Sequence, residues 1–118
     1  MNYMQRKDVT IFQKVISEID IGLTILGSAT PDEFLQNEVL KRAVGMTVIN
    51  VGELIKNVSE ETKQTHREIP WKAAAGMRDI AAHKYQTLRM EDVYNTLKID
   101  FPVMKQQLQS LLETDQNI

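Results

Sequence analysis

Apolar residues recur at steps of three and four along most of this chain, and this spacing constrains the fold more than any other feature. The clearest example lies within residues 8–26 and consists of Val9, Phe12, Ile16, Ile19, Leu23 and Leu26. Such spacing places one apolar stripe along an α-helix, whereas a half-buried strand would alternate apolar and polar residues. No segment of the 118 residues shows that alternation. The sequence therefore predicts an all-α fold, an up-and-down antiparallel bundle of four to five helices, with residues 1–118 as one domain.

The second predicted helix has a well-marked start. Thr30, Pro31 and Glu33 supply a capping side chain, a proline suited to the first helical turn and a glutamate placed for a capping box. The apolar stripe continues beyond them, so we predict one helix over about residues 31–58. The apolar face of this helix is wide enough to contact several neighbours. We therefore expect the helix to be the central one and to offer a surface to a second chain.

Small and polar residues interrupt this central stripe. Gly45 and Gly52 are seven residues apart, share one face, and would let a neighbouring backbone approach closely. Asn50 and Glu53 are polar within an apolar run. We interpret them as members of a satisfied hydrogen bond at a helix interface rather than as catalytic groups.

The remaining chain predicts a loop and two further helical segments. Residues 59–69 are polar and lose their periodicity, which predicts a helix tail followed by a loop. Pro70 suits the start of a third helix, on which Trp71 is predicted to enter the core. The last apolar stripe continues across Pro102 and consists of Val93, Leu97, Phe101, Met104, Leu108 and Leu111. We expect one long kinked helix here, or two helices in line with Asp100 as a local cap.

Composition excludes several classes of protein. The chain has no cysteine, which excludes both a disulfide scaffold and a thiolate zinc site. No apolar run reaches about 18 residues, and the first residues lack the apolar core of a signal peptide. We therefore expect a soluble, cytoplasmic protein with no membrane partner.

Positive charge gathers in one part of the chain. The net charge of −2 argues against nucleic-acid binding through bulk positive charge. Between positions 63 and 89, however, only two acids accompany the six bases Lys63, Arg67, Lys72, Arg78, Lys84 and Arg89. This cluster is either the footprint of a polyanion site or a chance grouping on a solvated face.

Residues 76–85 concentrate the side chains that are suited to chemistry. They include Arg78, Asp79, His83 and Tyr85 among small apolar residues. On a regular helix Arg78 and Tyr85 share a face, but His83 lies about 140° from Arg78. Either the helix ends or bends near His83, or two copies of the chain combine their side chains across a two-fold axis. The second alternative predicts a homodimer with a shared cleft.

An arginine and a histidine together suffice for RNA cleavage without a metal ion. The guanidinium of Arg78 suits phosphate oxygens, and the imidazole of His83 can accept the proton of a 2′-hydroxyl. Asp79 would orient a side chain or the backbone of a partner chain. The two histidines, His66 and His83, are not accompanied by carboxylates at a metal-binding spacing, so no metal or cofactor is expected. The structural alternative is that Arg78 makes a surface ion pair, His83 a satisfied interior contact and Tyr85 a packing contact.

The motif and its surroundings resemble the HepT-like branch of the HEPN superfamily. The resemblance rests on an Ile-Pro-Trp entry to the motif helix, the spacing Arg-x4-His-x-Tyr, a Gly-Glu pair on the long helix and a proline in the last helix. In this chain these elements are residues 69–71, 76–85, 52–53 and 100–104. The similarity extends over about residues 44–112.

The resemblance implies a homodimeric ribonuclease toxin in which Arg78 and His83 are the catalytic pair and Asp79 is a supporting polar residue. It further implies that a minimal nucleotidyltransferase antitoxin adenylylates Tyr85 and thereby blocks the RNA cleft. The family also contains members without established nuclease activity. A second hypothesis is therefore a non-catalytic helical module that binds a nucleotidyltransferase, or nucleotides, through the same basic face.

Overall fold

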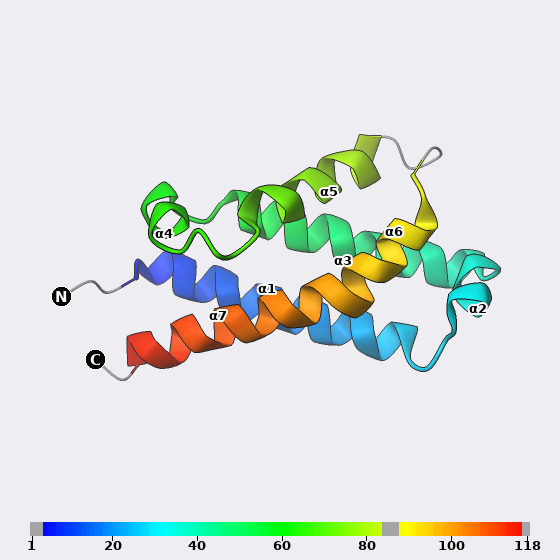
Figure 1. Cartoon of the computed structure of the whole chain (residues 1–118), viewed down its shortest axis with the longest axis horizontal. Coiled ribbons are helices and arrows are strands. Elements are labelled where there is room, and N and C mark those ends of the chain that lie inside the picture. The colour runs from blue at the N-terminus through cyan, green and yellow to red at the C-terminus, as the bar shows by residue number, and fades with distance from the viewer. Residues whose placement is uncertain (1–3, 84–87, 117–118) are drawn as a thin grey trace.

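The computed structural model describes the backbone of residues 4–83 and 88–116 and the side chains of residues 4–79 and 88–114. Within these ranges the long helices are α1 (Arg6–Leu26), α3 (Glu38–Lys56), α5 (Trp71–His83) and α7 (Phe101–Gln116), as Figure 1 shows. The shorter helices α2 (Pro31–Leu35), α4 (Glu60–Thr65) and α6 (Met90–Asn95) connect or extend them. No strand occurs in this described part of the chain, and the predicted all-α class is confirmed.

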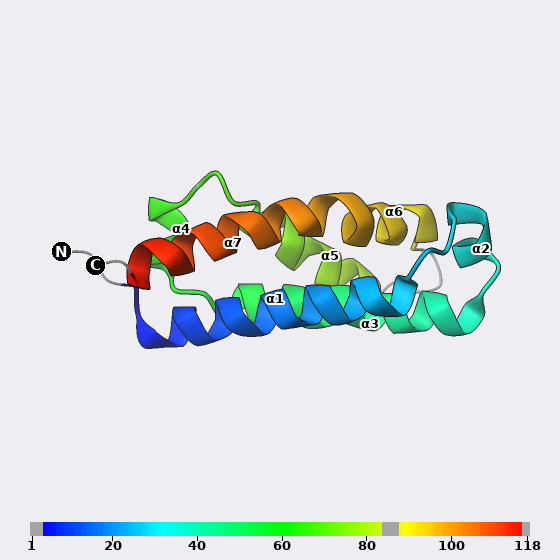
Figure 2. The ribbon, with the colours of Figure 1, turned by 90° about the horizontal axis from the view of Figure 1, so that it is seen from below.

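The long helices run alternately up and down the bundle. α1 and α5 run in one direction, and α3 and α7 run in the other (Figures 1 and 2). α3 contacts α1 and α5, whereas α7 packs against α1. α3 is therefore the central helix, as the width of its apolar face predicted.

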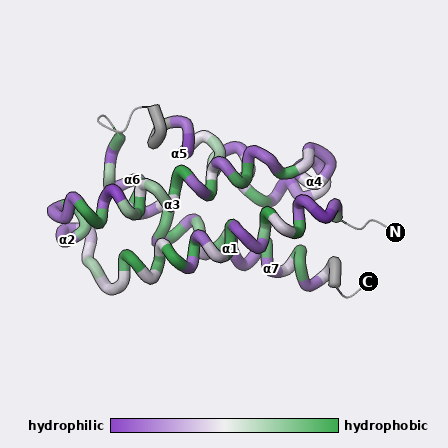
Figure 3. The backbone as a smooth tube through the Cα atoms, turned by 180° about the vertical axis from the view of Figure 1, so that it is seen from behind, coloured by the Kyte–Doolittle hydropathy of each residue, from purple (hydrophilic) through white to green (hydrophobic). Residues whose placement is uncertain are grey.

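The core is a continuous apolar layer between these helices. Side chains without exposed surface come from several helices of the bundle and include Phe12, Phe34, Val48, Ile55, Leu97 and Leu108. Apolar and polar segments alternate along each helix (Figure 3). Burying a side chain of this size stabilises the fold by about 1.5–3 kcal/mol. The apolar stripes seen in the sequence supply these buried side chains, and their burial holds the helices together. None of the helices described here combines the length and apolar content needed to cross a membrane.

Trp71 lies in the core, as predicted. Its ring stacks on Phe12 of α1, with 5.9 Å between the ring centroids and an interplanar angle of 18°. Its indole Nε1 donates a hydrogen bond to the carbonyl oxygen of His66 at 2.9 Å. The first residue of α5 is thereby fixed both to α1 and to the loop that follows α4.

The prediction of a single helix over residues 31–58 is wrong, because two helices occupy that range. α2 begins with the predicted capping box, in which Thr30 and Glu33 exchange hydrogen bonds, but it is only five residues long. Asn37 then adopts an extended conformation, and its Oδ1 accepts a hydrogen bond from the backbone N of Leu40 at 2.9 Å. Asparagine favours this position because its side-chain oxygen satisfies a backbone N–H that the helix leaves unpaired.

The prediction of a helix tail at the start of residues 59–69 is also wrong. α3 ends before this segment, and α4 is a separate helix whose N-cap is Ser59. The hydroxyl of Ser59 accepts a hydrogen bond from the backbone N of Thr62 at 3.3 Å. A loop follows α4, and α5 begins at Trp71, directly after Pro70.

The last helical segment continues in line past Pro102. α6 leads into a π-helical turn, η2 (Thr96–Asp100), and α7 begins at the next residue. Pro102 has no N–H to donate to the carbonyl of Lys98, and its ring would crowd that carbonyl in a regular helix. The wider turn of η2 accommodates the missing hydrogen bond and the proline ring. The apolar stripe stays buried before and after this turn. Asp100 belongs to η2 and does not act as a cap.

A buried carboxylate fastens α4 to the start of α1. Asp8 has no exposed surface, and its side chain accepts hydrogen bonds from Ser59 N at 2.9 Å, Ser59 Oγ at 2.6 Å and Thr62 Oγ1 at 2.7 Å. Burial alone would raise the pKa of Asp8, but the hydrogen bonds from Ser59 and Thr62 outweigh burial and lower it. These three residues are referred to below as the Asp8 cluster.

A glycine lets α3 and α5 approach closely. A Cβ atom at Gly52 would overlap the Cβ of Arg78 and lie 2.9 Å from the carbonyl oxygen of Ala74. The predicted close approach at Gly52 is confirmed, and Gly45 on the same face of α3 is buried.

Gly52→Ala should lower the free energy of unfolding by about 1–3 kcal/mol, because the added methyl group forces the two helices apart. Gly76→Ala on α5 is the matched control, since a Cβ atom there meets nothing within 4 Å. The control should be neutral or gain up to about 1 kcal/mol from better helix propensity. Urea unfolding followed by circular dichroism measures both changes, and equal effects of the two variants would contradict the close contact.

Asp8→Asn should lower the free energy of unfolding by about 1–3 kcal/mol at neutral pH, because hydrogen bonds to a charged acceptor are weakened. The pKa of Asp8 is lowered on folding, so its contribution is present above the ordinary value of 3.8 and is lost as the pH falls below it. Urea unfolding of wild type and variant at stepwise lower pH should therefore show a shrinking difference. The exposed Asp32→Asn should change stability by less than about 0.5 kcal/mol. A difference between wild type and Asp8→Asn that is constant with pH would refute the assignment.

Candidate functional site

The guanidinium of Arg78 lies between two carboxylates. Its Nε is 2.7 Å from Oε2 of Glu53 on α3, and its Nη1 donates a hydrogen bond to Oδ1 of Asp79 at 2.9 Å. The hydrogen bond to Asp79 is the main cause of a raised pKa at Arg78, and the negative charges of Glu53 and Asp79 add to it against the effect of burial. Arg78 is therefore a permanent cation that is held in place.

The orientation of Arg78 leaves one nitrogen of its guanidinium available to a ligand. Nη1 donates a hydrogen bond to Asp79, and Glu53 makes an ion pair at Nε without hydrogen-bond geometry, while no described residue pairs with Nη2. The side chain is 24% exposed, so a ligand can reach it from solvent. A phosphate oxygen is the acceptor that such a fixed, partly exposed guanidinium suits best.

Local sequence explains how Arg78 reaches Glu53. Gly52 places the backbone of α5 directly against α3, and the next residue supplies the carboxylate. Glu53 thus makes a contact at a helix interface, as inferred from the sequence, but it is half-exposed and its partner is the motif arginine. Asn50, in contrast, makes the expected interface hydrogen bond, from its Nδ2 to Oε1 of Glu18 at 3.1 Å.

Asp79 connects Arg78 to a further cation. Its Oδ1, which accepts the hydrogen bond from Arg78, also lies 3.8 Å from Nζ of Lys56 at the end of α3. The predicted supporting residue thus contacts the arginine of its own chain. With Glu53, these residues form a row of alternating charges across the α3–α5 contact.

The two other motif residues are described only in part or not at all. His83 is the last residue of α5, and its backbone is α-helical, while its side chain lies outside the described set. Because α5 is helical from Arg78 to His83, their positions point about 140° apart around one axis. Tyr85 falls outside the described residues, so the predicted roles of His83 and Tyr85 stay predictions.

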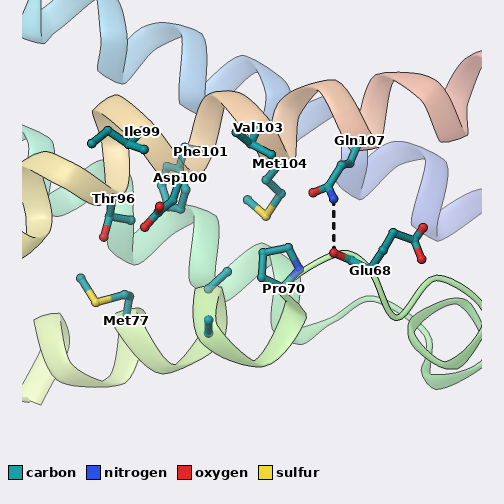
Figure 4. Close-up of a pocket in the computed structure, with 12 residues that line it drawn as sticks. Glu68, Pro70, Met77, Thr96, Ile99, Asp100, Phe101, Val103, Met104 and Gln107 are labelled. Carbon is teal, nitrogen blue, oxygen red and sulfur yellow. Dashed lines mark hydrogen bonds between the residues drawn. The ribbon is translucent and has the colours of Figure 1, made fainter.

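An apolar groove lies on another side of α5. It has a volume of about 390 Å³ and separates α5 from η2 and α7 (Figure 4). Met77, Ile99 and Met104 line it, and Gln107 closes one end by donating a hydrogen bond to the carbonyl oxygen of Glu68 at 3.2 Å. Arg78 does not line this groove, so the groove is distinct from the charged site.

No metal site is apparent among the described residues. Glu53 and Asp79 pair with Arg78 and Lys56. No group of three or more His, Cys, Asp or Glu side chains in the described ranges could hold a metal ion.

Comparison with known proteins adds independent information. The family model described as Ribonuclease HepT-like matches residues 15–111. A relative from Caldanaerobacter subterraneus subsp. tengcongensis, named "Putative RNase TTE0752", is 25% identical over 103 residues, which cover 87% of this chain and 92% of that protein. A relative from Thermococcus cleftensis, named "Probable ribonuclease HepT", is 32% identical over 80 residues, which cover 68% of this chain and 73% of that protein.

A longer relative comes from Methanocaldococcus jannaschii and is named "Gamma-glutamylcyclotransferase and putative RNase MJ0434". It is 31% identical over 109 residues, which cover 92% of this chain but only 49% of that protein. No solved structure matches the chain.

Proposed function

Since the chain belongs to the HepT-like ribonuclease family, we propose that it is a metal-independent endoribonuclease toxin that acts on RNA in the cytoplasm. We further propose that it acts as a homodimer, and that a minimal nucleotidyltransferase antitoxin inactivates it by adenylylating Tyr85. Arg78 and His83 are the proposed catalytic pair, and Glu53 and Asp79 are the proposed positioning residues.

The held guanidinium of Arg78 is the observation that carries this proposal. In the proposed reaction His83 accepts the proton of a 2′-hydroxyl, and the resulting oxygen attacks the adjacent phosphorus. The bond to the 5′-oxygen of the next nucleotide breaks, and that oxygen takes up a proton from the imidazolium or from water, which leaves a 2′,3′-cyclic phosphate and a 5′-hydroxyl. Nη2 of Arg78 would stabilise the negative charge that builds up on the phosphorane, and the contacts with Glu53 and Asp79 fix the guanidinium before the substrate arrives.

An exposed apolar stripe on α3 supports the proposed dimer. Val39 is 79% exposed and Met46 is 55% exposed, and they lie on the same face of α3 as Glu53 at intervals of seven residues. Exposed apolar side chains in such a row favour association with another surface. A second copy covering this stripe across a two-fold axis would bring two Glu53–Arg78 pairs together. The two copies could then combine Arg78 and His83 in one cleft, although the two positions point apart on a single helix.

The family resemblance implies the proposed inactivation, and the spacing of Arg78 and Tyr85 is compatible with it. The hydroxyl of Tyr85 would attack the α-phosphate of ATP, release pyrophosphate and retain an adenylyl group. On a regular helix, positions seven residues apart share a face. The added nucleotide would then supply bulk and negative charge where the substrate phosphate binds.

His83→Ala should lower the rate of RNA cleavage by about 10²–10⁴-fold, because general-base catalysis disappears. Purified protein is incubated with a single-stranded RNA in EDTA, and products are examined for 2′,3′-cyclic phosphate ends. His66→Ala is the matched control, since His66 lies outside the motif at the end of α4 and should leave the rate unchanged. In cells, wild type and the control should stop growth and degrade RNA, whereas His83→Ala should not.

Equal cleavage by wild type and His83→Ala would contradict the proposed chemistry. Absence of any RNA product from the wild type, together with a stable complex with a nucleotidyltransferase, would instead support the non-catalytic binding module.

Co-expression with the nucleotidyltransferase should add one adenylyl group to the peptide that contains Tyr85, as measured by mass spectrometry, and should suppress cleavage. Tyr85→Phe should remain unmodified and active. Tyr94 is an internal control, because it is 8% exposed and its hydroxyl donates a hydrogen bond to the carbonyl oxygen of Ala29 at 3.0 Å. Inhibition of the Tyr85→Phe variant to the same extent as wild type would show that simple docking suffices.

A further inference from the structure

A second groove, with basic side chains, lies between α4 and α5. It has a volume of about 740 Å³, and its lining includes Lys63 and Arg67 on one side and Lys72 on the other. Glu60 is the acid among its lining residues. Lys63 and Lys72 pair with no carboxylate within the described part of the chain, so both ammonium groups are available to an anion.

Small side chains form the α5 side of this basic groove. Ala73 and Ala75 of α5 line it without bulky side chains, so an extended chain can lie close to the helix. Trp71 also lines the groove, but it is only 7% exposed and its ring is stacked on Phe12. The ring face is therefore not free to stack on a base, and the groove offers positive charge rather than base recognition.

The basic groove leads towards the proposed catalytic pair. Counted from Ala75 on the helical wheel, Arg78 lies about 60° to one side and position 83 about 80° to the other. A chain that lies along the α5 face at Ala75 therefore passes between the positions of Arg78 and His83. Lys72 precedes Arg78 by six residues, or about 9 Å along the helix axis, which keeps the groove within reach of the same bound strand.

We propose that the groove between α4 and α5 binds the sugar–phosphate backbone of single-stranded RNA next to the point of cleavage, with Lys63 and Lys72 as its phosphate-binding residues. The inference rests on the proposed ribonuclease function and adds a substrate-binding surface to it. A positively charged groove that follows a strand's backbone is typical of sequence-independent binding to single strands. The groove would therefore position the RNA backbone beside the catalytic residues without selecting the RNA sequence.

The experiment compares Lys63→Gln/Lys72→Gln with wild type in cleavage and in binding. Cleavage of a mixed-sequence single-stranded RNA should show a raised KM and a kcat near that of wild type, because neither lysine touches the reacting atoms. Binding of a fluorescent 2′-O-methyl 12-mer, which cannot be cleaved, should weaken. The slope of log affinity against log salt should decrease in magnitude by about 1.4, or about 0.7 for each lost phosphate contact.

Lys98→Gln is the matched control, since Lys98 is exposed on η2 and does not line the basic groove. It should leave KM and the salt slope at the wild-type values. Circular dichroism and urea unfolding establish that all variants are folded, and the exposed position of Lys72 makes a loss of folding unexpected.

The outcomes separate this inference from the proposed function. Unchanged KM and salt slope in the double variant would overturn the groove while leaving the ribonuclease intact. Lysine-dependent binding of the 12-mer by a wild type that never cleaves RNA would support the groove and reject the catalytic proposal. Normal RNA binding with a weakened nucleotidyltransferase complex would overturn the inference, because the groove would then be a protein-docking surface.

Discussion

The contact between α3 and α5 at Gly52 is the constraint on which the charged site depends. Because this residue has no side chain, the backbone of α5 lies against α3, and Glu53 reaches the guanidinium of Arg78 at 2.7 Å. The arginine is therefore fixed by residues from two helices rather than by its own helix alone. Any phosphate chemistry at this position uses a cation whose orientation was set when the bundle folded.

Most of the fold could be predicted because apolar spacing is a local signal. The stripes of α1, α3, α5 and α7 each repeat within a few residues, and the capping box at Thr30 is complete within four. The cap at Asn37 was missed because it divides a helix by one side-chain hydrogen bond without disturbing the apolar pattern, and the cap at Ser59 was missed because the polar segment after it carries no periodic signal. Single polar residues of this kind decide where helices begin, and they are easily outweighed by a long periodic run.

The site could be predicted only in part, since its geometry depends on distances between helices. The motif singled out Arg78 and Asp79, and both lie in one charged row. Glu53 was expected to pair at a helix interface, but its partner Arg78 was not foreseen, because nothing in the spacing of one helix reveals which residue of another faces it. The cluster of bases is also divided by the structure, since Lys63, Arg67 and Lys72 line a groove whereas Arg78 is held in ion pairs.

The Asp8 cluster gives one wall of the basic groove a stability of its own. α4 has six residues, too few to persist as an isolated helix, and Ser59 and Thr62 fasten it to the start of α1. The wall that carries Lys63 and Arg67 thus depends on a few buried hydrogen bonds, while the apolar layer holds the long helices together. α4 would open as a separate unit, and its amides would exchange hydrogen with solvent well before those of the four long helices.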